Sequence, residues 1–377
     1  MREIQKIFVD KEVLSFPLTK RIIKRCPGVP AAVVRNKQEL DVLLASSTDP
    51  TGEGKKYLWL SRHKGAFVKP CPCTPHYVGC NYFVINLALN CPLDCSYCIL
   101  QVYLANPWIT IYVNLNDLWT ELDTFGREKK GKFVRIGTGE LSDSLALDHI
   151  TQTSSELISY FARKSKVLLE LKTKTTNIAG VLDRPAAENI VLSWSLNSEK
   201  IAREEEKGAP PVEDRIETAK VVSEKGLPVG FHFDPLILYP GWEEDYARVV
   251  EKLLCSVIPS RIRWISLGSL RFPPALKPII EKRFPPSRII YGELIQGKDG
   301  KLRYFKPLRI ELYQKIIALI KYWGGGQIPF YFCMEDTEVW ERALKKTPRR
   351  KEEVELILSP RLNGSKSMAS KSGPSGY

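Results

Sequence analysis

Three closely spaced cysteines that follow an apolar segment at residues 82–89 have clear metal-binding chemistry. They form a CxxxCxxC pattern at Cys91, Cys95 and Cys98. Three thiolates can bind three irons of a cubane cluster, and the fourth iron then stays open to chelate a small molecule. A zinc site usually shows two spaced pairs of ligands, and the sequence has no second CxxC and no HxxxH pattern. The motif predicts a [4Fe–4S] cluster, with a fourth ligand from Cys73 or Cys80 as an open alternative.

The other cysteines and the composition indicate a reducing compartment. Six of the nine cysteines lie between Cys71 and Cys98, and an odd total with such crowding favours metal or thiol chemistry over disulfides. The 377 residues contain no apolar run of the roughly 18 residues that span a bilayer. The first residues lack the apolar block of a signal peptide. We expect a cytoplasmic protein, a monomer without membrane contact.

The net charge of +13 bears on the kind of partner. A basic protein that binds a polyanion gains free energy because each neutralised phosphate releases condensed counterions. A generally basic surface without a specific partner would give the same charge. Charge alone therefore favours nucleic acid without establishing it.

Apolar runs alternate with helical patterns from Tyr82 onward and position the cysteine motif. Strands that are apolar nearly throughout, separated by amphipathic helices, are typical of parallel β/α units. Six such runs favour a partial (β/α)6 barrel of the TIM type, with an open sheet as the alternative, and they lie at 82–89, 132–137, 166–173, 189–196, 227–237 and 261–270. The loops at the carboxyl ends of barrel strands build active sites. The cysteines follow the first run, where this geometry requires them.

The segments outside the predicted barrel divide the chain further. Residues 1–78 are expected to form a small α/β region with a cysteine-bearing linker, and 79–345 the barrel. An Asp-Gly turn at Asp299 predicts a hairpin within 288–307, followed by a helix. Residues 346–377 are charged and then rich in Ser and Gly, so we expect them to be disordered.

The predicted hairpin and one barrel loop carry basic and aromatic side chains suited to DNA. Such side chains can neutralise phosphates and wedge beside a damaged base step. The candidates are Arg271, Lys298, Lys301, Arg303 and Tyr304. An edge hairpin whose lysines merely prevent aggregation is the alternative.

The chain resembles the spore photoproduct lyase family of radical S-adenosylmethionine (SAM) enzymes. The resemblance rests on CPLDCSYCILQ followed in order by SDSLALDH, LSWSLNS, GWEEDY, SLGSLRF and YFCMED. It implies a radical SAM barrel with a [4Fe–4S] cluster, SAM and an electron donor. It also implies a location in the spore core if the source forms spores. The implied activity is DNA repair, in which a 5′-deoxyadenosyl radical starts the reversal of the spore photoproduct, a thymine dimer formed by ultraviolet light, to two thymines.

The resemblance also implies roles for individual residues. The glycine-rich string after the second strand resembles the motif that binds the SAM amino group, and other positions match family residues that contact SAM. These cofactor-binding candidates are Gly137, Gly139, Glu140, Ser142, Asp143, Lys174 and Ser195. Tyr97, between two ligand cysteines, has an implied role beside SAM in hydrogen-atom relay or in packing.

Two positions depart from the family pattern. Leu141 stands where the best-known members carry the cysteine that returns a hydrogen atom to the thymine radical, and Ile99 replaces a tyrosine found in some members. Another thiol must then act as donor, and Cys71 in the string KPCPC is the first candidate because it resembles the upstream cysteine of clostridial members. A lyase-like enzyme with another substrate, or a DNA-binding Fe–S protein without lyase activity, are the alternatives.

Overall fold

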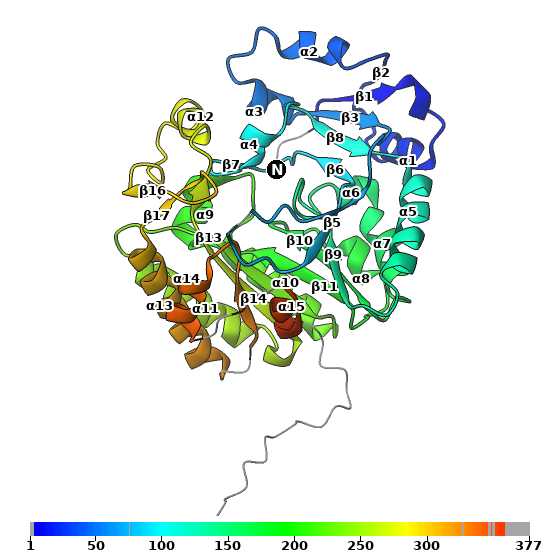
Figure 1. The fold of residues 1–377 in the computed structure, drawn as a ribbon. Coiled ribbons are helices and arrows are strands. Elements are labelled where there is room, and N and C mark those ends of the chain that lie inside the picture. The colour runs from blue at the N-terminus through cyan, green and yellow to red at the C-terminus, as the bar shows by residue number, and fades with distance from the viewer. Residues whose placement is uncertain (1–3, 75, 326–327, 346–347, 349–350, 359–377) are drawn as a thin grey trace, which may run out of the picture.

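The computed structural model describes residues 4–358 except 75, 326, 327, 346, 347, 349 and 350. Its centre is an eight-stranded sheet that curls into a partial barrel (Figure 1). In spatial order the strands are β18 (Phe330–Phe332), β14 (Ile262–Ser269), β13 (Val229–Leu236), β11 (Ile190–Ser195), β10 (Val167–Thr173), β9 (Val134–Gly137), β5 (Tyr82–Ile85) and β4 (Val68–Pro70). Neighbours pair in parallel, except that β4 is antiparallel to β5.

The predicted barrel is confirmed and is larger than expected. All six apolar runs contain strands of the curled sheet, and every residue of β11 is buried, because both faces of the strand are covered. A seventh parallel strand, β18, comes from the apolar run after Gly326, which the sequence analysis left unassigned. The two edge strands of the sheet are therefore β4 and β18.

Helices cover the outer face of the sheet (Figure 1). The long ones are α5 (Leu115–Glu128), α7 (Thr153–Phe161), α10 (Val212–Glu224), α11 (Trp242–Ser256) and α13 (Lys306–Gly324). Shorter helices lie in the connections, as α4 (Leu100–Tyr103), α6 (Asp148–Thr151), α8 (Ala179–Leu182), α9 (Glu199–Glu205), α12 (Leu276–Arg283) and α14 (Thr337–Leu344), with a 3-10 turn at Pro259–Arg261. Buried apolar side chains from helices and strands form one large core, with a smaller separate cluster that includes residues of α9 and α12.

A second sheet packs above the barrel and involves more of the chain than expected. Its order is β2 (Ala31–Val34), β1 (Lys6–Asp10), β3 (Tyr57–Ser61), β8 (Ile109–Tyr112) and β6 (Ala88–Leu89). Its helices are α1 (Pro17–Arg25), α2 (Gln38–Leu44) and α3 (Pro50–Gly54), with a 3-10 turn at Lys11–Val13. The predicted boundary at residue 78 is wrong, because β6 and β8 follow that residue and complete this sheet.

The hairpin is confirmed, and part of the predicted tail is structured. Strands β16 (Leu294–Gln296) and β17 (Leu302–Tyr304) form the hairpin, and β15 (Arg271–Phe272) adds a third strand. Helix α15 (Lys351–Leu358) corrects the prediction of disorder for its residues, because Val354 and Leu358 are buried in the core. The remainder of the predicted tail, 359–377, lies outside the described residues. None of the helices in the described part of the chain has the length and apolar character that a membrane crossing requires.

Candidate active site

The three predicted cluster cysteines lie on the loop that leaves the carboxyl end of β5, at the mouth of the partial barrel. Within this loop, β7 (Asp94–Cys95) pairs antiparallel with β12 (Glu206–Lys207) and so anchors the centre of the motif. Cys95 is buried, Cys91 and Cys98 are half-buried, and all three are free thiols. The fold therefore presents the whole motif on one short loop.

The chemistry of this loop fits a cubane cluster. Burial raises the pKa of Cys91 to about 12 and also raises that of Cys95, so both thiols need a cationic partner to ionise. The Leu93 N–H already points at Cys91 Sγ, at 3.4 Å. Across the described residues, no three His, Cys, Asp or Glu side chains are placed to hold one metal ion. A cubane takes each cysteine on a different iron, so Cys91, Cys95 and Cys98 suit it better than they suit a single zinc ion.

Gly137 at the end of β9 and Gly139 just after it lie too close to neighbouring strands to carry side chains. A Cβ on Gly137 would lie 1.9 Å from Tyr82 Oη, and one on Gly139 would lie 2.6 Å from Lys172 Cβ. Glu140 follows the glycines and forms an ion pair with Lys172 on β10. Packing thus accounts for the glycines, and the partly exposed Glu140–Lys172 pair is the charged feature that the loop presents at the barrel mouth.

Asp143 joins the same loop to the end of β10. Its carboxylate accepts hydrogen bonds from Thr173 Oγ1 at 2.7 Å and from the N–H groups of Leu145 at 2.9 Å, Ala146 at 2.8 Å and Lys174 at 2.8 Å. Its neighbour Ser142 is half-buried. Asp143 therefore shapes the backbone of the loop, and a direct contact of Ser142 or Asp143 with SAM stays a prediction.

Glu206, which the sequence analysis did not select, contacts two of the predicted site residues, Tyr97 and Lys174. Tyr97 donates its hydroxyl hydrogen to Glu206, Lys174 Nζ lies 3.9 Å from the carboxylate, and Arg215 pairs with it at 2.6 Å. Burial opposes the charge on Glu206, but Arg215 and Lys174 lower its pKa. Arg215 also donates to the carbonyl of Ser195 at 3.0 Å. No motif marks Glu206 in the sequence, because only the β7–β12 pairing brings it to the cluster loop.

A second group of thiols lies where the edges of the curled sheet approach each other. Its members are Cys71, Cys73, Cys80 and Cys333. The Val78 N–H donates to the Glu335 carbonyl at 2.9 Å, which joins the linker between β4 and β5 to the segment after β18. Burial raises the pKa of Cys71, and the nearby Glu140 and Cys80 raise it further. Cys71 thus lies near the Glu140–Lys172 pair, whereas neither Cys73 nor Cys80 belongs to the cluster loop.

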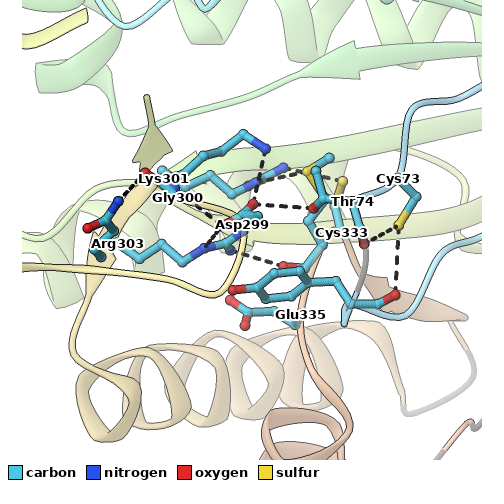
Figure 2. A network of polar contacts seen from close by, with 12 residues as sticks. Cys73, Thr74, Asp299, Gly300, Lys301, Arg303, Cys333 and Glu335 are labelled. Carbon is cyan, nitrogen blue, oxygen red and sulfur yellow. Dashed lines mark hydrogen bonds and ion pairs between the residues drawn. The ribbon is translucent and has the colours of Figure 1, made fainter. Parts of the chain in front are cut away.

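Cys333 is a half-buried thiol directly after β18 that the sequence analysis did not select. Arg271 Nη2 donates to its sulfur at 3.4 Å, and Arg271 Nη1 donates to Asp234 at 2.7 Å. Burial and the neighbouring Asp234 raise the pKa of Cys333. Figure 2 shows Cys333 within the same network of polar contacts as Cys73. Its position after an apolar run was the available signal, had that run been assigned as a seventh barrel strand.

Three of the five side chains predicted to contact DNA are buried in this structure. Asp299 accepts hydrogen bonds from Lys301 Nζ at 3.0 Å and from Arg303 Nη2 at 2.6 Å (Figure 2). Lys301 and Arg303 are buried by this pairing, and Tyr304 is buried with its hydroxyl accepting the Leu238 N–H at 3.1 Å. In this conformation these three side chains do not reach the surface. Lys298 at the turn is exposed and Arg271 is 12% exposed, and a DNA contact stays a prediction for all five.

Comparisons with known proteins agree with this geometry. A family model described as spore photoproduct lyase matches residues 77–309. The spore photoproduct lyase of Bacillus subtilis is 30% identical over 215 residues, which cover 56% of this chain and 63% of the relative. That of Clostridium acetobutylicum is 20% identical over 306 residues, which cover 80% of this chain and 89% of the relative. The chain thus spans less than two thirds of the Bacillus protein and nearly all of the clostridial one.

Solved structures show the same fold. A spore photoproduct lyase mutant superposes with a TM-score of 0.79 at 23% identity, covering 88% of this chain and 99% of the other. A second mutant, with bound AdoMet and dinucleoside spore photoproduct, gives a TM-score of 0.77 over 88% of this chain and 98% of the other. The curled sheet is therefore the barrel of those structures. With the family model matching more than half of its residues, the chain belongs to the spore photoproduct lyase family.

Proposed function

We propose that this chain is a radical SAM lyase that reverses the spore photoproduct in ultraviolet-damaged DNA to two thymines. The observation that carries the proposal is the position of three free cysteines after β5, at the mouth that also holds the Glu140–Lys172 pair and the second group of thiols. Family membership supports the activity, and so does a related structure that contains AdoMet and dinucleoside spore photoproduct.

The residues around the mouth suit the parts of SAM. When bound, the cluster and SAM supply a 5′-deoxyadenosyl radical, which takes a hydrogen atom from the bridged thymine dimer. Glu140 is an acceptor suited to the SAM ammonium, and Lys174 is a donor suited to its carboxylate. Glu206 holds Tyr97 and Lys174 in place, so the cluster loop and the end of β10 share one support. The fold orients the reacting groups and excludes water, while the cofactor carries the difficult chemistry.

The hydrogen atom that completes the repair is proposed to come from Cys71. Leu141, at the usual donor position, has no transferable hydrogen, and its carbonyl accepts the Asn90 N–H at 2.9 Å beside the cluster loop. The raised pKa of Cys71 keeps it protonated at neutral pH, and a hydrogen-atom donor must carry its hydrogen. In this step the S–H bond breaks homolytically and a C–H bond forms on the thymine radical.

A second candidate function is a lyase-like radical reaction on another substrate. The specific observation in its favour is Leu141, because a substrate radical that needs no returned hydrogen atom would need no thiol at that position. A DNA-binding Fe–S protein without enzymatic activity is the third candidate.

One assay separates the three. Protein reconstituted with iron and sulfide without oxygen would be mixed with SAM, dithionite and dinucleoside spore photoproduct, and the products followed by mass spectrometry. Two thymidines support repair, 5′-deoxyadenosine without loss of the dimer supports another substrate, and neither product supports binding alone. Cys71→Ala should divert the thymine radical to abnormal adducts. Cys255→Ala is the matched control, because that thiol is exposed on α11.

A further inference from the structure

Lys55, in the N-terminal sheet region, reaches into the cluster loop with its whole side chain. The residue follows α3, and its side chain is only 2% exposed. Its ammonium donates to Asn90 Oδ1 at 3.1 Å, to the Cys91 carbonyl at 2.8 Å and to the Leu93 carbonyl at 2.6 Å. An ammonium has three hydrogens, so all three are donated to acceptors around the first cluster ligand: one side-chain amide oxygen and two backbone carbonyls.

The surrounding loops are shaped to receive this lysine. A Cβ on Gly54 would lie 2.5 Å from the backbone of Pro107, so only glycine allows α3 to approach so closely. Asn90 has a φ of 68°, and its side chain joins the cluster loop to the segment at Pro107, since it donates to the Pro107 carbonyl at 2.7 Å and accepts the Cys91 N–H at 2.9 Å. Contacts with the N-terminal region therefore fix the conformation of the cluster loop.

The charge of Lys55 belongs to a set of ionic side chains with alternating signs. Asp94, inside the cysteine motif, lies 3.9 Å from Lys55 Nζ, and Arg283 contacts both Asp94 carboxylate oxygens at 3.1 Å. Arg283 also pairs at 2.7 Å with Asp49, whose side chain is 41% exposed, whereas Lys55, Asp94 and Arg283 are buried. Removal of the charge of Lys55 or of Asp94 therefore changes the net charge by one unit in a low-dielectric region beside the cluster cysteines.

We propose that Lys55 and Asp94 set the reduction potential of the cluster, and that Lys55 is a positioning residue for the loop that holds it. The inference rests on the proposed function, since it requires a cluster on Cys91, Cys95 and Cys98. Reduction adds one electron to the cluster, and a buried positive charge nearby stabilises the reduced state. Net charge and hydrogen bonding around a cluster are known determinants of its potential. The N-terminal region thus tunes how readily the enzyme accepts its electron.

The test compares two variants that change the local charge in opposite directions. Lys55→Met leaves a net negative charge and should lower the midpoint potential, whereas Asp94→Asn leaves a net positive charge and should raise it. Potentials would be measured by redox titration followed by electron paramagnetic resonance. Lys56→Met is the matched control, because Lys56 is the next residue. Within the described part of the chain its ammonium pairs only with Glu53, at the surface. The variant should leave the potential unchanged.

The role of Lys55 in positioning the cluster loop is tested by a separate measurement, the rate of iron loss. Lys55→Met should lose iron at least about tenfold faster on exposure to a chelator, and Lys55→Arg should restore much of the retention because it keeps the charge and several donors. Potentials that stay unchanged, or that move in the same direction in Lys55→Met and Asp94→Asn, would overturn the inference. If Lys55→Met does not fold, the rise expected for Asp94→Asn decides alone. Wild-type protein that takes up no cluster would instead refute the proposed function.

Discussion

The two walls of the barrel mouth are built in different ways. The wall that carries the cluster cysteines is one continuous loop, and the buried Lys55 bonds to three of its acceptors. The second wall is assembled from the edge strands β4 and β18, the linker between β4 and β5, and the hairpin β16–β17. Its parts are joined by separate contacts, such as Thr74 Oγ1 to Asp299 at 3.3 Å.

This difference suggests that the two walls have different functions. A cofactor with fixed geometry is best served by a loop whose backbone is fixed before binding, which Lys55 and the β7–β12 pairing provide. Under the proposed function, a DNA lesion must be admitted and released. A wall held by a few side-chain contacts can separate at lower cost than one held by a buried backbone network. We expect variants of the first wall to abolish chemistry, and those of the second to change stability and DNA binding.

The largest effect is expected on the cluster wall. Cys95→Ala should abolish SAM cleavage, because two cysteines cannot hold a three-ligand cubane. The protein should still fold, since Cys95 is buried but is not part of the main apolar core. Iron content and 5′-deoxyadenosine formation measure the loss, and circular dichroism checks the fold. Retained SAM cleavage would show that Cys95 is not a required ligand and that another residue takes its place.

Variants of the second wall should change the stability of the protein. Asp299→Ala leaves Lys301 and Arg303 buried without their carboxylate, and breaking such a pair costs about 3 kcal/mol. Denaturation in urea would measure the free energy of unfolding. Glu217→Ala is the control, because Glu217 forms an exposed pair with Lys220 on α10 and its loss should change stability by less than about 1 kcal/mol. An equal, small effect for both variants would mean that the Asp299 pairing does not hold this wall together.

The same network predicts a pH dependence of stability. Burial opposes the ionisation of Asp299, but bonds from Arg303 and Lys301 hold its pKa below the usual range. Its contribution is therefore full above the unfolded pKa of about 4 and is lost as the pH falls through the lower folded pKa. The stability difference between wild type and Asp299→Asn should be largest near neutral pH and shrink below pH about 4. A difference that grows on acidification would contradict the pairing.

The sequence predicted the barrel better than it predicted the walls. Apolar runs identify buried parallel strands because both of their faces are covered, so β10 and β11 were found. Strand β18 is only three residues long, and its run could not be assigned without the partner strand β14. The cluster cysteines were found because their spacing is local. Lys55 and Glu206 act through contacts distant in sequence, and nothing near them in the chain marks them, whereas Cys333 had only the unassigned apolar run before it as a signal.

The hairpin shows the limit of composition as evidence. Basic and aromatic residues alternate there, which favoured DNA contacts for all of them. The sequence also contains Asp299, but it does not reveal that this carboxylate turns back onto Lys301 and Arg303. Antiparallel pairing with Arg271 on β15 further places Arg303 on an inner face. Whether a basic side chain is available to DNA thus depends on the turn geometry, which composition does not contain.

The smallest expected effect belongs to Lys298, at the exposed turn of the hairpin. Each phosphate contact contributes about 0.9 to the slope of log affinity against log salt for duplex DNA. Lys298→Ala should reduce the magnitude of that slope by about this amount, measured by fluorescence anisotropy with duplex DNA, whereas Lys225→Ala at the exposed end of α10 should not. Lys301→Met should also leave the slope unchanged, because Asp299 already neutralises Lys301. If Lys301→Met instead lowers the slope as much as Lys298→Ala does, the Asp299 pairing opens when DNA binds. The second wall would then be a closed state that DNA displaces.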